Sequence, residues 1–397
     1  MLRLYRRSLI YREMCYILKR GDDMKRNNTV DLIKGLGIFG VVLAHSGFPL
    51  SDAVYLFHMP IFLMASGYCF RQKHAESPSA LGAYIGKKVK SLYVPYVIFN
   101  AIFILFYNAL ISWNIYTDNT QFSSPVQRKT WWQLWSALNN CLHFNPGGTQ
   151  QLCGADWFVI ILFYITVLFA VACWFTRIFK NKTLQNILLG GSAVAALLVG
   201  YLLQKRKIFL DGYWSPAVTG YALYVLGFFL SKLPASSLER VMAKLKWPFA
   251  VLGAAFFLVA TRYGSISLNV NHFTDPLFLV VCSLVGWFWL YALADIMKAS
   301  NLLNRIFSCL SKSSLFILFL HFLGFKLVTA IQLAVYNEPG YLLASFPVLH
   351  TEGLWWIAYT VAGVLFPVAV KLLFNFTASL IKKKVAVMDK ATVITEK

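Results

Sequence analysis

The chain has 397 residues, of which 58% are hydrophobic and only 13% are charged, so a water-soluble globule of this size would lack polar residues to cover its surface. The net charge of +21 does not indicate a nucleic-acid-binding protein, because the basic residues stand in small clusters between apolar segments. The seven cysteines show no metal-ligand spacing, so the sequence predicts no metal site and no bound cofactor. The composition favours an integral membrane protein.

Residues 1–30 are predicted to form a basic cytosolic segment. Asp22 and Asp23 interrupt this segment, and it lacks the continuous apolar core of a cleavable signal peptide. We therefore expect the first membrane helix to direct insertion by itself.

Apolar stretches of about twenty residues, the length that crosses a bilayer, predict an all-α polytopic bundle of about ten membrane helices. They lie near 31–50, 53–70, 92–113, 156–176, 184–203, 216–231, 247–263, 275–297, 313–335 and 353–376. We expect one membrane domain over 31–376 and a basic cytosolic tail over 377–397. Most of the 37 Lys and Arg residues fall in the connections on the side of the N-terminus, which identifies that side as cytosolic. Both termini are therefore predicted to face the cytosol of a bacterium, with the chain in its inner membrane.

The first predicted helix contains ionisable side chains, which are costly inside a bilayer and are therefore functional candidates. Asp31 and His45 fall on nearly the same stripe, but the rise of about 1.5 Å per residue separates them by about 20 Å. Asp31 is thus not a direct hydrogen-bond partner of His45. Gly37, Gly40 and Ala44 leave a smooth side on which another helix can approach closely. We expect this helix to be packed within the bundle, with His45 facing an interior cavity.

The second predicted helix carries His58 at a depth similar to that of His45, followed by Pro60. Proline removes a backbone donor, which favours a break in the helix and a pocket beside it. Two roles are open for His58. It orients a substrate or assists proton transfer, or it caps or bridges the distorted helix near Pro60.

The longest predicted external segment carries three tryptophans and two cysteines. The tryptophans either lie in the membrane interface or stack on sugar rings. The cysteines are candidates for a disulfide in an oxidising periplasm, which their spacing alone does not establish. These residues, within 114–155, are Trp131, Trp132, Trp135, Cys141 and Cys153.

Another external connection departs from the charge pattern, because it contains Lys205, Arg206 and Lys207 in succession. This cluster either faces an anionic substrate or consists of side chains that snorkel at a helix end. The sequence leaves both interpretations open.

Three stretches resemble a known family. RNNTVDLIKGLGIFGVVLAH, followed by FHMPIFLMASGYCF and by a basic stretch that ends in LYVPY, resembles the opening of the family 3 acyltransferases. Within that family the chain is most similar to the fucose 4-O-acetylase-like group, in which FHMP and a following SGY recur. DWF at 156–158 and LFILFLH at 315–321 extend the resemblance.

The resemblance implies transfer of an acyl group, commonly acetyl, from cytosolic acetyl-CoA or another acyl-CoA to a carbohydrate hydroxyl. His45 stands where the family has an essential histidine, and imidazole suits a general base or an acyl relay. A structural role within the bundle is the alternative for His45. The implied partners are acyl-CoA, a carbohydrate acceptor, the lipid bilayer and polysaccharide-assembly proteins.

Basic residues follow the second predicted helix, where the family tends to have an Arg-x-x-Arg pattern that this chain lacks. Lysine binds a CoA phosphate as a point charge, without the bidentate fork of arginine. These residues therefore either bind the donor or only set the topology. They are Arg71, Lys87, Lys88 and Lys90.

Four further residues are candidates. His321 and Lys326 lie in the ninth predicted helix about 140° apart, so we expect them to face different ways, each with a possible contact to substrate. Arg26 and Asp31 match the family's opening pattern and are predicted to form an ion pair at the cytosolic mouth of the first helix.

The main alternative function is a transporter or flippase of a lipid-linked saccharide, in which the buried histidines relay protons. Within the acyltransferase interpretation, acetyl and succinyl donors both remain open. So does the identity of the carbohydrate acceptor.

Overall fold

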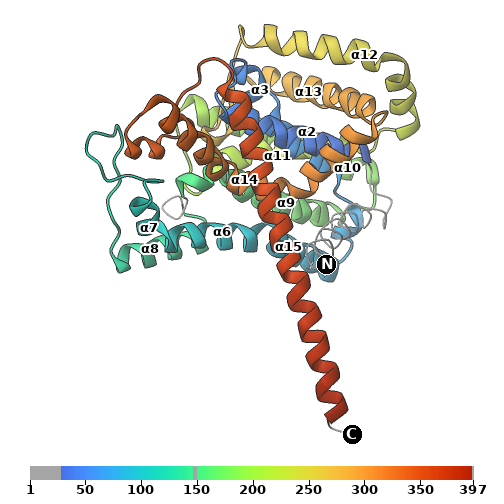
Figure 1. Cartoon of the computed structure of the whole chain (residues 1–397). Coiled ribbons are helices and arrows are strands. Elements are labelled where there is room, and N and C mark those ends of the chain that lie inside the picture. The colour runs from blue at the N-terminus through green and yellow to red at the C-terminus, as the bar shows by residue number, and fades with distance from the viewer. Residues whose placement is uncertain (1–27, 146–149, 396–397) are drawn as a thin grey trace.

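The computed structural model describes residues 28–145 and 150–395, and Figure 1 shows that helices make up nearly all of this part. The helices are α2 (Asn28–His45), α3 (Ser51–Tyr55), α4 (His58–Tyr68), α5 (Pro78–Lys88), α6 (Val94–Leu105), α7 (Tyr107–Ser112), α8 (Trp131–Leu142), α9 (Trp157–Thr176), α10 (Lys182–Lys205), α11 (Trp214–Leu230), α12 (Ala235–Ala260), α13 (Pro276–Met297), α14 (Asn301–Tyr336) and α15 (Trp355–Thr395). A short hairpin pairs β1 (Ile266–Ser267) with β2 (His272–Phe273) in antiparallel fashion.

Eight helical segments in the described part are long and apolar enough to cross a membrane. They are Asn28–His45, Pro78–Leu105, Trp157–Thr176, Lys182–Lys205, Ser236–Ala260, Pro276–Met297, Asn301–Tyr336 and Trp355–Ile381. The other two predicted segments are also helical but shorter, as α3 with α4 and as the 17-residue α11. The chain is therefore a multi-pass, all-α membrane protein, as the hydropathy pattern predicts.

The second predicted membrane helix is broken, which confirms the expectation from Pro60. α3 ends at Tyr55 and α4 begins at His58. Pro60 occupies the first turn of α4, where backbone N–H groups have no partner inside the helix and a missing donor costs little. The break places His58 and Met59, at the start of α4, in the lining of a pocket.

α2 lies at the centre of the bundle, in contact with α4, α13, α14 and α15. Gly37 and Gly40 face α4, so another helix does approach this side closely: a Cβ on Gly37 would lie 3.1 Å from the Phe62 ring, and one on Gly40 would lie 3.5 Å from the Cβ of His58. This close packing fixes the position of His45, the last residue of α2.

Arg26 and the rest of the predicted N-terminal segment up to residue 27 lie outside the described residues. The predicted tail begins inside α15, which continues to Thr395 and projects away from the bundle in Figure 1.

Cys141 and Cys153 are both buried as free thiols, so the disulfide left open by their spacing is not formed in this structure.

Candidate active site

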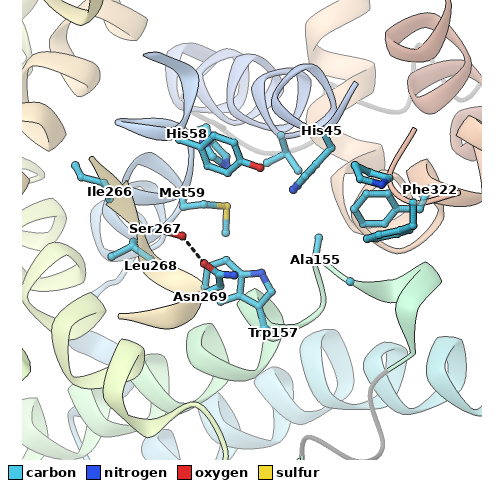
Figure 2. A pocket seen from close by; sticks show the side chains of 15 residues that line it. His45, His58, Met59, Ala155, Trp157, Ile266, Ser267, Leu268, Asn269 and Phe322 are labelled. Atoms are coloured by element: carbon cyan, nitrogen blue, oxygen red, sulfur yellow. Dashed lines mark hydrogen bonds between the residues drawn. The ribbon is translucent and has the colours of Figure 1, made fainter. Parts of the chain in front are cut away.

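A pocket of about 370 Å³ lies at the end of the bundle where α2 finishes (Figure 2). It is lined by the end of α2, by α3 and α4, by the segment that leads into α9, by the β1–β2 hairpin, by α14 and by the loop before α15. The lining residues are Val41, His45, Tyr55, His58, Met59, Gly154, Ala155, Trp157, Ile266, Ser267, Leu268, Asn269, Phe322, Phe346 and Pro347. Segments far apart in the sequence therefore meet around His45.

His45 is partly buried, and Figure 2 shows its ring directed into the pocket. Aromatic rings surround it, with centroid distances of 6.0 Å to Tyr55, 5.1 Å to Phe322 and 5.3 Å to His321. These contacts hold the imidazole in place while leaving one edge open to the cavity.

His58 is almost fully buried, at 1% exposure, in the first turn of α4. Its Nδ1 donates a hydrogen bond to the Val54 carbonyl oxygen at 2.8 Å, since a carbonyl can only accept. Nε2 of the neutral ring then carries a lone pair, which suits a proton or hydrogen-bond acceptor. The Tyr55 ring lies 5.1 Å from that of His58, so both histidines and Tyr55 share one wall of the pocket.

His321 lies behind His45. Its Nδ1 donates to the carbonyl oxygens of Ile317 and Leu318, at 2.9 and 3.0 Å, and its ring stacks on that of His45 at an interplanar angle of 29°. Phe322, the next residue, lines the pocket instead. The structure thus brings His321 to the candidate catalytic histidine, where it is positioned to orient His45.

Lys326 contacts the segment that follows α14, whereas His321 stacks on His45. Its Nζ donates to the carbonyl oxygens of Leu343 and Ser345, at 2.9 and 2.7 Å. These bonds fix the loop immediately before Phe346 and Pro347, which line the pocket. Lys326 therefore shapes the pocket through this loop.

The other basic candidates gather at the opposite end of the bundle. Lys87 and Lys90 line a separate hollow of about 540 Å³. Burial, together with the charges of Lys73, Lys87, Lys88 and Arg71, lowers the pKa of His74. Lys34, on α2, hydrogen-bonds Cys69 beside this group and stands about 16 Å from His45 along the helix.

Sequence reasoning missed several pocket residues. Tyr55, Asn269 and Phe346 carry no motif, and the hairpin appeared only as a connection between two predicted helices. Trp157 belongs to the DWF stretch, so the sequence could have identified it as a candidate site residue. The tryptophans of α8 are exposed by 60% or more and do not line this pocket: Trp131, Trp132 and Trp135.

A buried carboxyl supports the segment that leads into α9. Asp156, at 1% exposure, accepts a hydrogen bond from Nδ2 of Asn100 at 2.8 Å, and Oδ1 of Asn100 accepts one from the Gln150 backbone at 3.2 Å. The network ties α6 to the neighbours of Trp157. Burial raises the pKa of Asp156 from 3.8 to about 7, against the opposing effect of the hydrogen bond from Asn100.

We expect this carboxyl to make stability depend on pH. Because the folded state holds the proton of Asp156 up to about pH 7, the protonated carboxyl contributes fully to the free energy of unfolding below pH 4. This contribution is lost as the pH rises through 7. The unfolding temperature of the wild type should therefore be several degrees lower at pH 8 than at pH 5. Tryptophan fluorescence of the protein in detergent measures this difference. Asp156→Asn should flatten this difference. Equal pH dependence in both proteins would show that Asp156 is ionised in the fold.

Comparison with protein families matches residues 27–373 to the family described as "Acyltransferase domain". Comparisons with curated proteins and with solved structures gave no match. The matched range covers most of the chain and contains every residue that lines the His45 pocket. Membership implies an acyl donor, and the helices imply the lipid bilayer as surroundings. The chain therefore belongs to acyltransferase family 3, a family of membrane acyltransferases.

Proposed function

We propose that this protein is an O-acyltransferase of a bacterial inner membrane that moves an acetyl group from cytosolic acetyl-CoA to a hydroxyl of a cell-surface or lipid-linked carbohydrate. The observation that carries this proposal is the pocket at the end of α2, into which His45 opens beside Tyr55 and His58. The basic hollow at the opposite end of the bundle supports it, because it supplies cations for CoA phosphates.

The pocket has the chemistry of a sugar site. The Trp157 ring offers an apolar face on which a pyranose can stack. The Ser267 hydroxyl and the Asn269 amide, joined by a 2.7 Å hydrogen bond, supply polar contacts on the hairpin wall. One wall therefore recognises the acceptor while the opposite wall presents the histidines.

In the proposed reaction, His45 takes the proton of the acceptor hydroxyl as its oxygen attacks the thioester carbonyl carbon. A carbon–oxygen bond forms, the carbon–sulfur bond breaks, and the CoA thiolate receives the proton that the imidazole holds. In the relay variant of this scheme, the imidazole nitrogen first accepts the acyl group and then passes it to the hydroxyl. His321, stacked on His45, holds the ring at the required angle in either case.

The test is transfer of label from radiolabelled acetyl-CoA in membranes that contain the protein, supplied with total host glycolipid and polysaccharide. Label on carbohydrate, absent from membranes without the protein, is the expected result. A parallel reaction with succinyl-CoA identifies the acyl group. Movement of labelled saccharide across vesicles without any acyl transfer would favour a transporter instead.

The basic hollow makes a separate prediction about the donor. Exchange of both Lys87 and Lys90 for glutamine should raise KM for acetyl-CoA about tenfold, or about 1.4 kcal/mol, with little change in kcat. The matched control is the exposed pair Lys180 and Lys182, likewise changed to glutamine. An unchanged KM in the first variant would leave these lysines with a topological role alone.

A further inference from the structure

A second hollow, of about 340 Å³, lies on the other side of the β1–β2 hairpin. It is formed by the C-terminal end of α10 with the turn that follows, and by the hairpin itself. Asn269 lines the His45 pocket and the next residue, Val270, lines this second hollow. The same hairpin is therefore a wall of both. The residues of the second hollow are Leu203, Gln204, Lys207, Ile208, Phe209, Val270, Asn271 and His272.

Hydrogen bonds from α10 and α11 fix the hairpin wall. The Gln204 side chain donates to the Phe273 carbonyl at 2.8 Å and accepts from the Phe273 N–H at 3.1 Å. Asn271 is 2% exposed, donates to the Gly200 carbonyl at 3.0 Å and accepts from the Thr219 hydroxyl at 2.6 Å. The second hollow is thus built on buried polar contacts between separate elements.

The hollow carries positive charge that the described structure does not neutralise. Lys207 lines the hollow, and Lys205 and Arg206 precede it directly in the chain. All three are exposed, and none of them forms an ion pair with a described residue. They are not needed to cap α10, because the backbone N–H groups of 206, 207 and 208 already bond its last carbonyl oxygens. The cluster also lies at the end of the bundle where the charge pattern predicts few cations.

Apolar side chains lie directly beside these cations. Ile208, Phe209 and Val270 are 46%, 50% and 55% exposed and line the same hollow. Cations next to exposed hydrocarbon fit a ligand that has a phosphate at the head of a lipid chain, since the phosphate pairs with Lys and Arg and the chain covers the apolar surface. A soluble sugar would leave this apolar surface in water.

We propose that the hollow between α10 and the β1–β2 hairpin binds the phosphate of a membrane lipid. Lys207 lines the hollow and contacts the phosphate, the adjacent Lys205 and Arg206 add positive charge, and Ile208 and Phe209 contact the lipid chain. A saccharide attached to that phosphate reaches over the hairpin to the His45 pocket. This last step rests on the proposed function and defines the acceptor as a lipid-phosphate-linked saccharide.

Native mass spectrometry of the purified full chain in detergent tests the site without measuring acyl transfer. The probes are a polyprenyl phosphate, the matching polyprenol and phosphatidylglycerol. The test variant changes Lys205, Arg206 and Lys207 to glutamine, which removes the charges and keeps side chains of similar length. Position 207 has a φ of 54°, and glutamine there avoids a β-branched side chain. The control changes the exposed Lys180 and Lys182 to glutamine.

We expect the wild type and the control to retain polyprenyl phosphate at least about tenfold better than polyprenol, and the triple variant to lose this preference. Stronger retention of polyprenyl phosphate than of phosphatidylglycerol identifies the lipid carrier of the acceptor, and equal retention identifies a general headgroup site. Equal retention of phosphate lipids by the wild type and the triple variant overturns the proposal. Lys207→Gln alone should show a smaller loss, and it keeps the test valid if the triple variant is unstable. Failure here leaves acyl transfer unaffected, so the two proposals fail separately.

Discussion

Replacing His45 with alanine is expected to lower acyl transfer by about a thousandfold, because a positioned base or nucleophile contributes roughly that factor. The protein should remain abundant in the membrane. The ring borders an open pocket of about 370 Å³, so its removal enlarges an existing cavity and leaves the packing of α2 through Gly37 and Gly40 intact. The measurement is labelled acetyl transfer at equal amounts of membrane protein.

The matched control is His143→Ala. His143 is exposed just after α8, and its Nδ1 donates to the Asn139 carbonyl one turn away, at 2.8 Å. This variant should transfer acetyl at the wild-type rate. Transfer retained in His45→Ala would remove His45 from the mechanism and move attention to His58, on the same wall.

The two proposed roles of His45 are separable by omitting the acceptor. If the imidazole relays the acyl group, wild-type protein given labelled acetyl-CoA alone should carry label that hydroxylamine releases, and His45→Ala should carry none. If His45 acts as a general base, label should leave CoA only when carbohydrate is present. Label on both the wild type and His45→Ala would place the acyl group on another residue.

The sequence predicted which ionisable side chains gather at the end of α2, because membrane burial makes each such side chain informative. The cost of a polar group in a bilayer singled out His45, His58 and His321, and the structure brings all three together. The glycines of α2 and the proline of α4 also have direct steric meaning, so close packing and a helix break followed from them. The effects of the glycines and the proline are local in the sequence, and the cost of an ionisable side chain is a general property of the bilayer as a solvent.

The remaining walls could not be predicted, because they depend on which loops fold back over the end of α2. The hairpin at 266–273 is held by Gln204 and Asn271 through contacts with α10, and no periodicity reveals such long-range bonds. The ammonium group of Lys326 likewise binds loop carbonyls from 343 and 345, which a helical offset does not indicate.

Gly227→Ala is expected to destabilise the whole bundle, since α4 and α11 meet there backbone to backbone. A Cβ on Gly227 would overlap the carbonyl oxygen of Met64, and one on Gly67 would overlap that of Tyr224. Neither obstacle is a flexible side chain, so the helices must separate. We expect a loss of about 3 kcal/mol or more, which is large for a single methyl group.

Gly191→Ala is the matched control, because a Cβ at that position in α10 meets nothing within 4 Å. Alanine there should be neutral or stabilising by up to about 1 kcal/mol through its helix propensity. Thermal unfolding in detergent, with size-exclusion profiles, compares the two variants, and equal stability would contradict the close approach of α4 to α11. Because α4 also carries His58 and Met59 into the pocket, any Gly227→Ala protein that folds should have its second histidine displaced. The spacing of two helices at this glycine pair therefore sets the geometry of the candidate active site from outside it.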